Sequence, residues 1–225
     1  TLLAKDGGNV LAAHLLKDEW FDVGRPWDLL DANNWALKRL TPKVLGTIEN
    51  GVHLNGLVYV AETARIRSGA YIEGPVFIDE QVDVGPNCYI RSGTSIGKRV
   101  RVGNAVEIKN SILMDDVHVG HLSYVGDSIL GEKCNLGAGT ITANLRFDYG
   151  HVKMKIKDNF VDTGRCKLGV ILGDNVKTGI NSLFMPGVKV GENTWVGANV
   201  VVEQDLPSDS VVLIRQTTTI KEKKK

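Results

Sequence analysis

The sequence predicts a mainly β fold, a left-handed parallel β-helix of hexapeptide repeats. An aliphatic residue returns at every sixth position over a long run, and a small or β-branched residue follows each of them four positions later. The two-residue period of a strand and the 3.6-residue period of a helix both fail to fit this spacing, whereas three hexads per triangular coil satisfy it. Prisms of this kind are generally left-handed. The aliphatic positions of the first run are Val60, Ile66, Ile72, Ile78, Val84, Ile90, Ile96, Val102 and Ile108.

The same repeat returns after a break, so the inward column is expected to continue to the end of the prism. About twenty hexads correspond to about seven coils, and each coil must stack on its neighbours to bury its apolar side chains. The spacing slips to five between Ile108 and Leu113 and between Val125 and Leu130, and an insertion spans residues 145–167. The positions of the second run are Leu172, Thr178, Phe184, Val190, Val196 and Val202.

The N-terminal part of the chain does not follow the repeat. The stretch EWFDVGRPWDLLDANNWALKRL predicts a short strand, a turn at residues 24–26 and a helix from about Trp27, for which Pro26 is a typical start. We therefore divide the chain into an N-terminal piece over 1–42, a linker over 43–57, a β-helix domain over 58–216 that carries the insertion, and a basic tail over 217–225. The N-terminal piece is too small to be a catalytic domain by itself.

Composition excludes several classes of partner. A net charge of +1 over 225 residues gives no electrostatic reason to expect nucleic acid or an acidic membrane surface. The three cysteines form no CxxC pair, which argues against a disulfide framework or a cysteine zinc site and favours a reducing, cytoplasmic compartment. No run of apolar residues is long enough for a transmembrane helix. Any anionic ligand must therefore be bound by a local group of cations.

One segment, GHLSYVGDSILGEKCNLGAGTITAN, carries polar residues that the repeat alone does not require. Together with VEIKNSIL, VGENTWVGANVVV and LIRQ, it resembles the acetyltransferase domain of the bifunctional N-acetylglucosamine-1-phosphate uridylyltransferase/glucosamine-1-phosphate acetyltransferase family and its archaeal sugar-1-phosphate relatives. WFDVGRPWDLLDAN is similar to the end of the nucleotidyltransferase domain that precedes the β-helix in that family. The resemblance implies that this chain is the C-terminal part of a two-domain enzyme. It also implies that Mg²⁺ would serve only the missing nucleotidyltransferase domain.

The chemistry implied by the resemblance is acetyl transfer from acetyl-CoA to the amine of glucosamine 1-phosphate or galactosamine 1-phosphate. An amine near neutral pH must lose a proton before it can attack a thioester. His121 matches the general base of the family, and histidine has the side-chain pKa nearest to working pH. Glu107 matches the carboxylate that holds the histidine ring. Asn144 matches the asparagine that faces the reacting amine and thioester.

The resemblance also assigns binding residues for the sugar phosphate. Arg91 and Lys109 match a phosphate-binding pair of cations, a role in which charge-assisted hydrogen bonds are strong. Tyr124 and Asn135 match residues that hold the phosphate and the sugar. From their positions in the hexad repeat alone, all four would be expected to be turn or surface residues.

Acetyl-CoA is expected to lie along the outside of the prism. Ala138 and Ala198 match positions that leave room for the pantetheine chain, and the Ala138 N–H would stabilise the developing oxyanion. Arg215 matches the residue that meets the CoA phosphate, whereas Ile180 replaces a serine of the bacterial CoA pocket. The resemblance further implies a parallel homotrimer with active sites where the subunits meet.

Two other functions remain open on the sequence. In the first alternative, the β-helix serves only to oligomerise a sugar nucleotidyltransferase. This function fits the hexad repeat but leaves the polar residues unexplained. In the second, the prism would bind zinc as γ-class carbonic anhydrases do, through three histidines. His118 and His121 are close in sequence, but no third histidine occupies a comparable hexad position. Assays of acetyl transfer and of zinc content would separate these functions.

Overall fold

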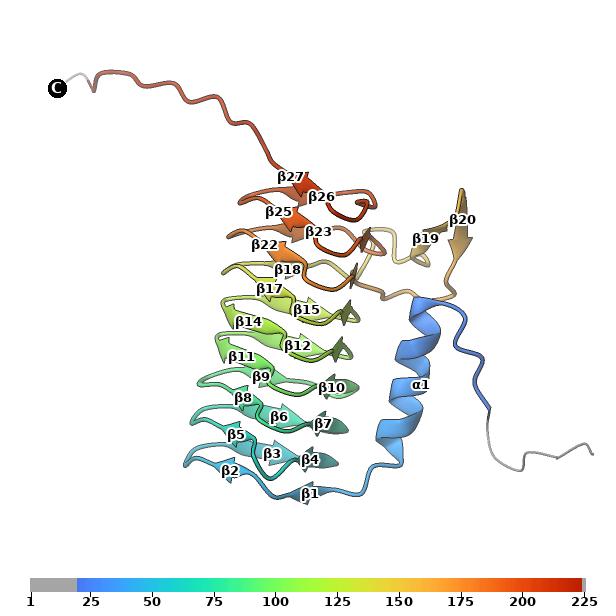
Figure 1. The fold of residues 1–225 in the computed structure, drawn as a ribbon, viewed down its shortest axis with the longest axis vertical. Helices are drawn as coiled ribbons and strands as arrows, with labels where there is room; N and C mark the ends of the chain where they lie inside the picture. Colours follow the sequence, from blue (N-terminus) through green and yellow to red (C-terminus); the bar gives the residue numbers. More distant parts are fainter. Residues whose placement is uncertain (1–19, 224–225) are drawn as a thin grey trace, which may run out of the picture.

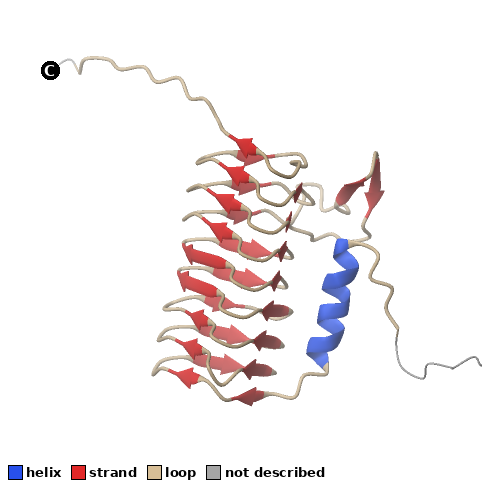
Figure 2. Ribbon diagram, in the orientation of Figure 1, coloured by secondary structure: helices blue, strands red, loops and turns tan. Residues whose placement is uncertain are grey.

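The computed structural model describes residues 20–223. The chain passes through three parallel sheets in turn, so each coil adds one strand to every sheet and the coils stack into a prism (Figure 1). The predicted fold class is confirmed, and the prism has about nine turns, more than the seven coils predicted. Figure 2 shows that α1 is separate from this stack of strands.

The strands are two to four residues long and fall into three stacked sets. The first sheet contains β1 (Lys43–Val44), β4 (Val58–Val60), β7 (Val76–Ile78), β10 (Thr94–Ile96), β13 (Ile112–Leu113), β16 (Ile129–Leu130), β21 (Ile171–Leu172) and β24 (Lys189–Val190). The second sheet contains β2 (Thr47–Ile48), β5 (Arg65–Ile66), β8 (Asp83–Val84), β11 (Arg101–Asn104), β14 (His118–His121), β17 (Asn135–Leu136), β22 (Lys177–Thr178), β25 (Trp195–Val196) and β27 (Val211–Val212). The third sheet contains β3 (His53–Asn55), β6 (Tyr71–Glu73), β9 (Tyr89–Ile90), β12 (Glu107–Lys109), β15 (Tyr124–Gly126), β18 (Ile141–Thr142), β23 (Leu183–Phe184) and β26 (Val201–Val202).

The repeating aliphatic side chains form the core of the prism. Val60, Ile78 and Ile96 are Cα partners in neighbouring strands, and all three are fully buried. Burial of each such side chain contributes about 1.5–3 kcal/mol. The five-residue slips shorten two coils but do not interrupt the column, because Ile96 pairs with Leu113 and Leu113 pairs with Leu130.

Residues 43–57, predicted as a linker, instead form the first coil of the prism. Strand β1 pairs with β4, β2 with β5 and β3 with β6, all in parallel. Ile48 and Leu54 pack against the core. They stand twelve and six positions before Val60, respectively, so the hexad repeat begins further toward the N-terminus than predicted.

The predicted helix is present as α1 (Pro26–Lys38), with a proline in its first turn. The expected strand before it is absent within the described residues 20–25, and residues 1–19 of the predicted N-terminal piece lie outside the described residues. Helix α1 packs over the outer face of the first sheet, where Trp27 and Leu30 form a second apolar cluster with Ile129 and Met154. The helix therefore covers one face of the prism.

The insertion leaves the prism after β18 and returns before β21. An antiparallel bridge between Leu145 and Lys167 closes its base. It contains the antiparallel hairpin of β19 (Lys153–Ile156) and β20 (Asn159–Asp162). Arg165, which follows the hairpin within the insertion, lies 2.6 Å from Asp31 of α1, so an ion pair joins the insertion to the helix.

The prism ends at β27, and residues 213–223 form no strand. Within residues 20–223, no helix has the length and apolar character needed to cross a membrane.

Candidate functional site

Four of the predicted site residues form a column along the corner between the second and third sheets. His121, Ala138, Ile180 and Ala198 occupy the same place in successive coils. The carbonyl oxygens of the first three each accept a hydrogen bond, at 2.8 to 3.3 Å, from the backbone N–H that follows the next member of the column. Parallel stacking thus places four distant sequence positions in one row, with His121, the last residue of β14, at one end and Ala198 at the other.

His121 opens onto a cavity of about 530 Å³ on the second sheet. His118, Asn135 and Ala138 also line this cavity. The imidazole of His121 is exposed and makes no hydrogen bond or ion pair with any described residue. Leu122 turns the chain directly after it with φ of 49°, an uncommon backbone conformation for a branched side chain. The histidine is therefore presented to the exterior at a sharp corner.

A second group of predicted residues lies on the outer face of the third sheet. Nη1 of Arg91 donates to Oε1 of Glu107 at 2.8 Å, and this hydrogen bond raises the pKa of Arg91. Across the parallel ladder, Glu107 lies opposite Tyr124. The carboxylate that the resemblance pairs with His121 thus contacts Arg91 in the chain itself, and no hydrogen bond joins Glu107 to His121 in residues 20–223.

Asn144 completes this group. Its Nδ2 donates to Oδ2 of Asp127 and, at 3.1 Å, to the hydroxyl of Tyr124. Lys109 Nζ lies 3.2 Å from the same Asp127 oxygen. Both hydrogens of the Asn144 side-chain amide are therefore engaged, which leaves its side-chain oxygen, Oδ1, available to accept a hydrogen bond from a ligand.

Gly126 allows these side chains to meet. A Cβ at this position would lie 2.4 Å from the Tyr124 hydroxyl oxygen and 2.8 Å from Asn144 Nδ2. Burial, and then the charge of Asp127, raise the pKa of Tyr124. The phenol stays protonated near neutral pH, so it accepts from Asn144 and can still donate to an anionic ligand.

Asp127 was not among the predicted site residues, although it ends the HLSYVGD motif. It is only 3% exposed and accepts hydrogen bonds from Lys109, Asn110 and Asn144. A buried carboxylate needs such partners. The sequence signal that could have identified it is its position, since Asp127 directly follows the short strand Tyr124–Gly126.

The predicted residues are thus divided between two faces of the prism. Asn135 lies on the second sheet, in register with His118 and Lys177, whereas Tyr124 lies on the third sheet. Arg215 is exposed and follows β27 beyond the last coil. One chain therefore does not bring Asn135 and Tyr124 together at a single site.

The sequence profile described as the GMPPB C-terminal domain matches residues 72–185, which include the predicted site residues from Arg91 to Ile180 but not Ala198 or Arg215. The chain belongs to the GMPPB C-terminal domain family. A second profile, the bacterial transferase hexapeptide with six repeats, matches residues 169–204.

Comparison with curated proteins supports the resemblance drawn from the sequence. The chain is 50% identical over 212 residues to the bifunctional protein GlmU of Methanocaldococcus jannaschii, covering 90% of this chain and 52% of the relative. It is 57% identical to the bifunctional protein GlmU of Methanococcus maripaludis C7, covering 93% and 51%. It is 44% identical to a bifunctional sugar-1-phosphate nucleotidylyltransferase/acetyltransferase of Sulfurisphaera tokodaii, covering 83% and 47%. The predicted kinship is confirmed, and the chain spans about half the length of these relatives.

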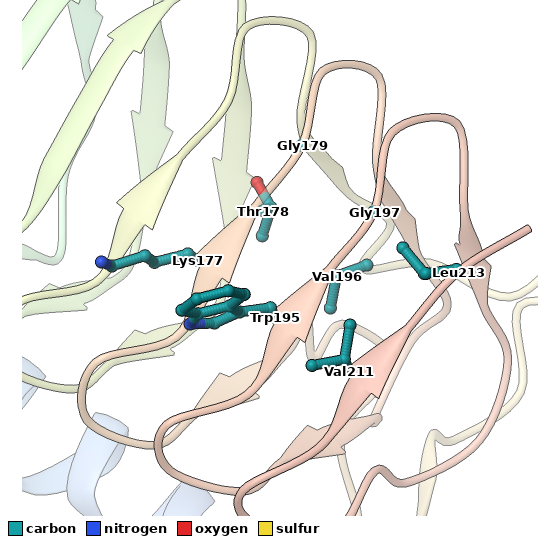
Figure 3. A pocket seen from close by; sticks show the side chains of 8 residues that line it. All are labelled: Lys177, Thr178, Gly179, Trp195, Val196, Gly197, Val211 and Leu213. Carbon is teal, nitrogen blue, oxygen red and sulfur yellow. The ribbon is translucent and has the colours of Figure 1, made fainter.

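The chain has a further groove beside the Ile180–Ala198 end of the column (Figure 3). The groove, of about 350 Å³, crosses β22, β25 and β27 and includes the glycines that precede Ile180 and Ala198. Lys177 Nζ lies 5.7 Å from the centre of the Trp195 ring, and Trp195 is 55% exposed. This pair was not among the predicted site residues, although a tryptophan at an outward position of a hexad was a signal in the sequence.

Within the described part of this GMPPB C-terminal domain chain, no three His, Cys, Asp or Glu side chains form a group suited to a metal ion. Burial raises the pKa of Cys88 and of Cys134 to about 12. These two thiols remain protonated near neutral pH and lack the thiolate that a nucleophilic cysteine requires.

Proposed function

We propose that this chain transfers the acetyl group of acetyl-CoA to the amine of glucosamine 1-phosphate or galactosamine 1-phosphate, a step of UDP-N-acetyl-amino-sugar biosynthesis. The observation that carries the proposal is the column in which His121 stands in line with Ala138, Ile180 and Ala198. An extended acyl thioester could lie along this column on the outside of the prism, with its acyl group next to His121 at the end of the row. The longer protein would also carry an Mg²⁺-dependent sugar-1-phosphate nucleotidylyltransferase, as the names of the relatives suggest.

In the proposed reaction, His121 takes a proton from the ammonium group of the sugar, and the amine attacks the thioester carbonyl carbon. The tetrahedral intermediate carries an oxyanion, for which the backbone N–H of Ala138 is the proposed donor. That N–H donates to no backbone carbonyl among residues 20–223. As the tetrahedral intermediate collapses, the attached nitrogen loses its second proton to solvent, the C–S bond breaks, and the protonated His121 gives its proton to the leaving sulfur. The N-acetyl sugar and free CoA are then released.

The acceptor would bind over the third sheet. Arg91 and Lys109 supply two cations for the sugar phosphate, and the free carbonyl oxygen of Asn144 is available to the amine. Each cation already contacts a carboxylate, Glu107 or Asp127. The phosphate must therefore add to two existing ion pairs, which hold the cationic groups in defined positions before substrate arrives.

We further propose that the active site forms between copies of the chain, in a homotrimer. His121 and Asn135 lie on the second sheet, while Arg91, Lys109 and Tyr124 lie on the third. Packing the second sheet of one copy against the third sheet of another would unite the two groups. Sedimentation of the active protein as a trimer would support this arrangement, and an active monomer would contradict it.

A cytoplasmic, reducing setting is also part of the proposal. All three cysteines are free, with Cys88 and Cys134 buried and Cys166 exposed. An exposed free thiol is typical of proteins kept in a reducing compartment. Alkylation of Cys166 in protein isolated without reductant would check its redox state.

The test is release of free thiol from acetyl-CoA with each amino sugar in turn. We expect turnover with at least one sugar, and a loss of about 10²–10⁴-fold in kcat for His121→Ala because the general base is removed. His53→Ala is the matched control, since His53 is exposed on β3 in the first coil. Absence of thiol release from the folded wild-type chain would leave the prism as an oligomerising scaffold and would overturn the proposal.

A further inference from the structure

A directed series of hydrogen bonds joins helix α1 to the acceptor side of the site. Nδ2 of Asn34 donates to the carbonyl of Leu30 at 3.0 Å and to Oδ1 of Asn110 at 2.7 Å. Nδ2 of Asn110 then donates to Oδ1 of Asp127 at 2.6 Å, and Oδ2 of Asp127 accepts from Nδ2 of Asn144. The series begins on α1, which stands beside the stacked coils in Figure 1, and ends at the side chain proposed to face the amine.

Each bond in this series determines which way the next amide is turned. An asparagine presents a carbonyl oxygen on one side and an NH₂ on the other, and its partners decide between the two orientations. The helix carbonyl of Leu30 can only accept, so Asn34 must turn its NH₂ toward it. Asn110 must then offer its oxygen to Asn34 and its NH₂ to Asp127. Because a carboxylate only accepts, Asn144 in turn must present its NH₂ to Asp127.

A similar ladder elsewhere in the prism shows what such a series contributes to structure alone. Asn175 donates to Asn193 at 3.2 Å, and Asn193 donates to Asp209 at 3.0 Å. Asp209 is exposed and receives no other side-chain hydrogen bond among the described residues. Asp127 differs, because it is 3% exposed and also receives Lys109 and Asn144.

We propose that Asp127 is a positioning residue for acetyl transfer, and that α1 supports it through Asn34 and Asn110. Asp127 holds the Asn144 amide with its oxygen directed to the amine site and holds Lys109 at the edge of the phosphate site. The inference rests on the proposed acetyltransferase function. It adds a buried carboxylate and a helix outside the prism to the groups that determine the geometry of the reaction.

Asp127→Asn tests the carboxylate with little change in shape. The backbone of Asp127 has φ of 50°, a conformation that asparagine tolerates well. Its new NH₂ must face either the donor of Asn110 or the donors of Asn144 and Lys109, so at least one donor–donor conflict arises in either orientation. We expect kcat to fall about ten- to a hundredfold, because small misplacements of reacting groups have effects of this size. KM for acetyl-CoA should stay within about twofold of wild type.

Asn34→Ala tests the contribution of the helix, and Asn33→Ala is its matched control. Asn33 also binds the prism, with Nδ2 donating to the Gly93 carbonyl at 2.9 Å and Oδ1 accepting from Ser95 at 2.6 Å. It has no link to Asp127. We expect both alanine variants to lower the melting temperature similarly, whereas only Asn34→Ala lowers kcat, by about three- to tenfold. Combined with Asp127→Asn, Asn34→Ala should lower kcat no further, because both act through one carboxylate.

The possible results are distinguishable. Wild-type-like kcat in Asp127→Asn, or equal kinetic effects of Asn33→Ala and Asn34→Ala, would overturn this inference while leaving the acetyltransferase proposal intact. A folded wild-type chain without acetyl transfer would overturn both. If Asp127→Asn does not fold, the comparison of the two alanine variants decides the question alone.

Discussion

Oε1 of Glu107 lies 2.8 Å from Nη1 of Arg91, on the outer face of the third sheet. In the chain as folded, this carboxylate therefore acts on a cation proposed to bind phosphate. Glu107→Gln keeps an oxygen acceptor for Arg91 but removes a negative charge near the phosphate. We expect KM for the amino sugar phosphate to fall severalfold, consistent with about 1 kcal/mol for two charges near 4 Å in water.

The pH profile of kcat distinguishes this role from one in orienting His121. A carboxylate next to histidine raises the histidine pKa, so its removal would shift the acidic limb of the profile to lower pH. We expect no such shift in Glu107→Gln. Glu73→Gln is the control, since Glu73 occupies the same face and accepts from Tyr89 at 2.5 Å. A clear acid shift in Glu107→Gln alone would instead place Glu107 against His121, within a copy or across the trimer.

Trp195 offers a test of where acetyl-CoA lies. Its ring packs against the ammonium group of Lys177, so an aromatic face and a positive charge lie side by side next to the column. Stacking of a base on an aromatic side chain contributes about 1–3 kcal/mol, so Trp195→Ala should raise KM for acetyl-CoA about tenfold with kcat unchanged. Trp195→Phe, which keeps a stacking face, should recover most of the affinity. Equal KM values in all three proteins would place the nucleotide elsewhere.

Asp83 predicts a pH dependence of stability. It accepts from Arg67 at 2.6 and 2.7 Å, and these hydrogen bonds lower its pKa in the folded protein. A depressed carboxyl pKa adds stability above the ordinary pKa of aspartate, and this is lost as pH falls through the folded value. Asp83→Asn should therefore melt a few degrees lower than wild type at pH 7, and the two melting temperatures should converge in acid.

Asp158→Asn is the control for this measurement, because Asp158 is exposed in the turn of the hairpin. Its melting temperature should follow wild type at every pH. A constant difference between Asp83→Asn and wild type from pH 7 to acid would contradict the electrostatic explanation.

Phe184 tests how far the stacked core supports the whole prism. It is 1% exposed, at an inward position of β23. Phe184→Ala should lower the free energy of unfolding by about 3–5 kcal/mol, through lost transfer energy and the cavity it leaves. Phe160→Ala, in a side chain 73% exposed on the hairpin, should change it by no more than about 0.5 kcal/mol. Chemical denaturation measures both, and equal losses would show that the core does not control the transition.

Much of the fold was predictable because a hexad repeat is a one-dimensional pattern. Each inward residue, such as Ile78 or Ile96, meets its counterpart one coil away, so periodicity alone identifies the core. The prediction failed where the pattern was sparse. Ile48 and Leu54 belong to the first coil, but they stand among polar and glycine residues that favoured a linker.

The order of residues alone was enough to identify the repeat, the helix from Pro26, the family and a set of polar residues worth testing. Tertiary structure decided which of them meet. Coil stacking placed His121 in line with Ala198, separated Asn135 from Tyr124, and brought Asn34 within hydrogen-bonding distance of Asn110. Contacts between side chains depend on coil length, corner geometry and the packing of α1 against the prism. These are long-range properties, which no local pattern in the chain encodes.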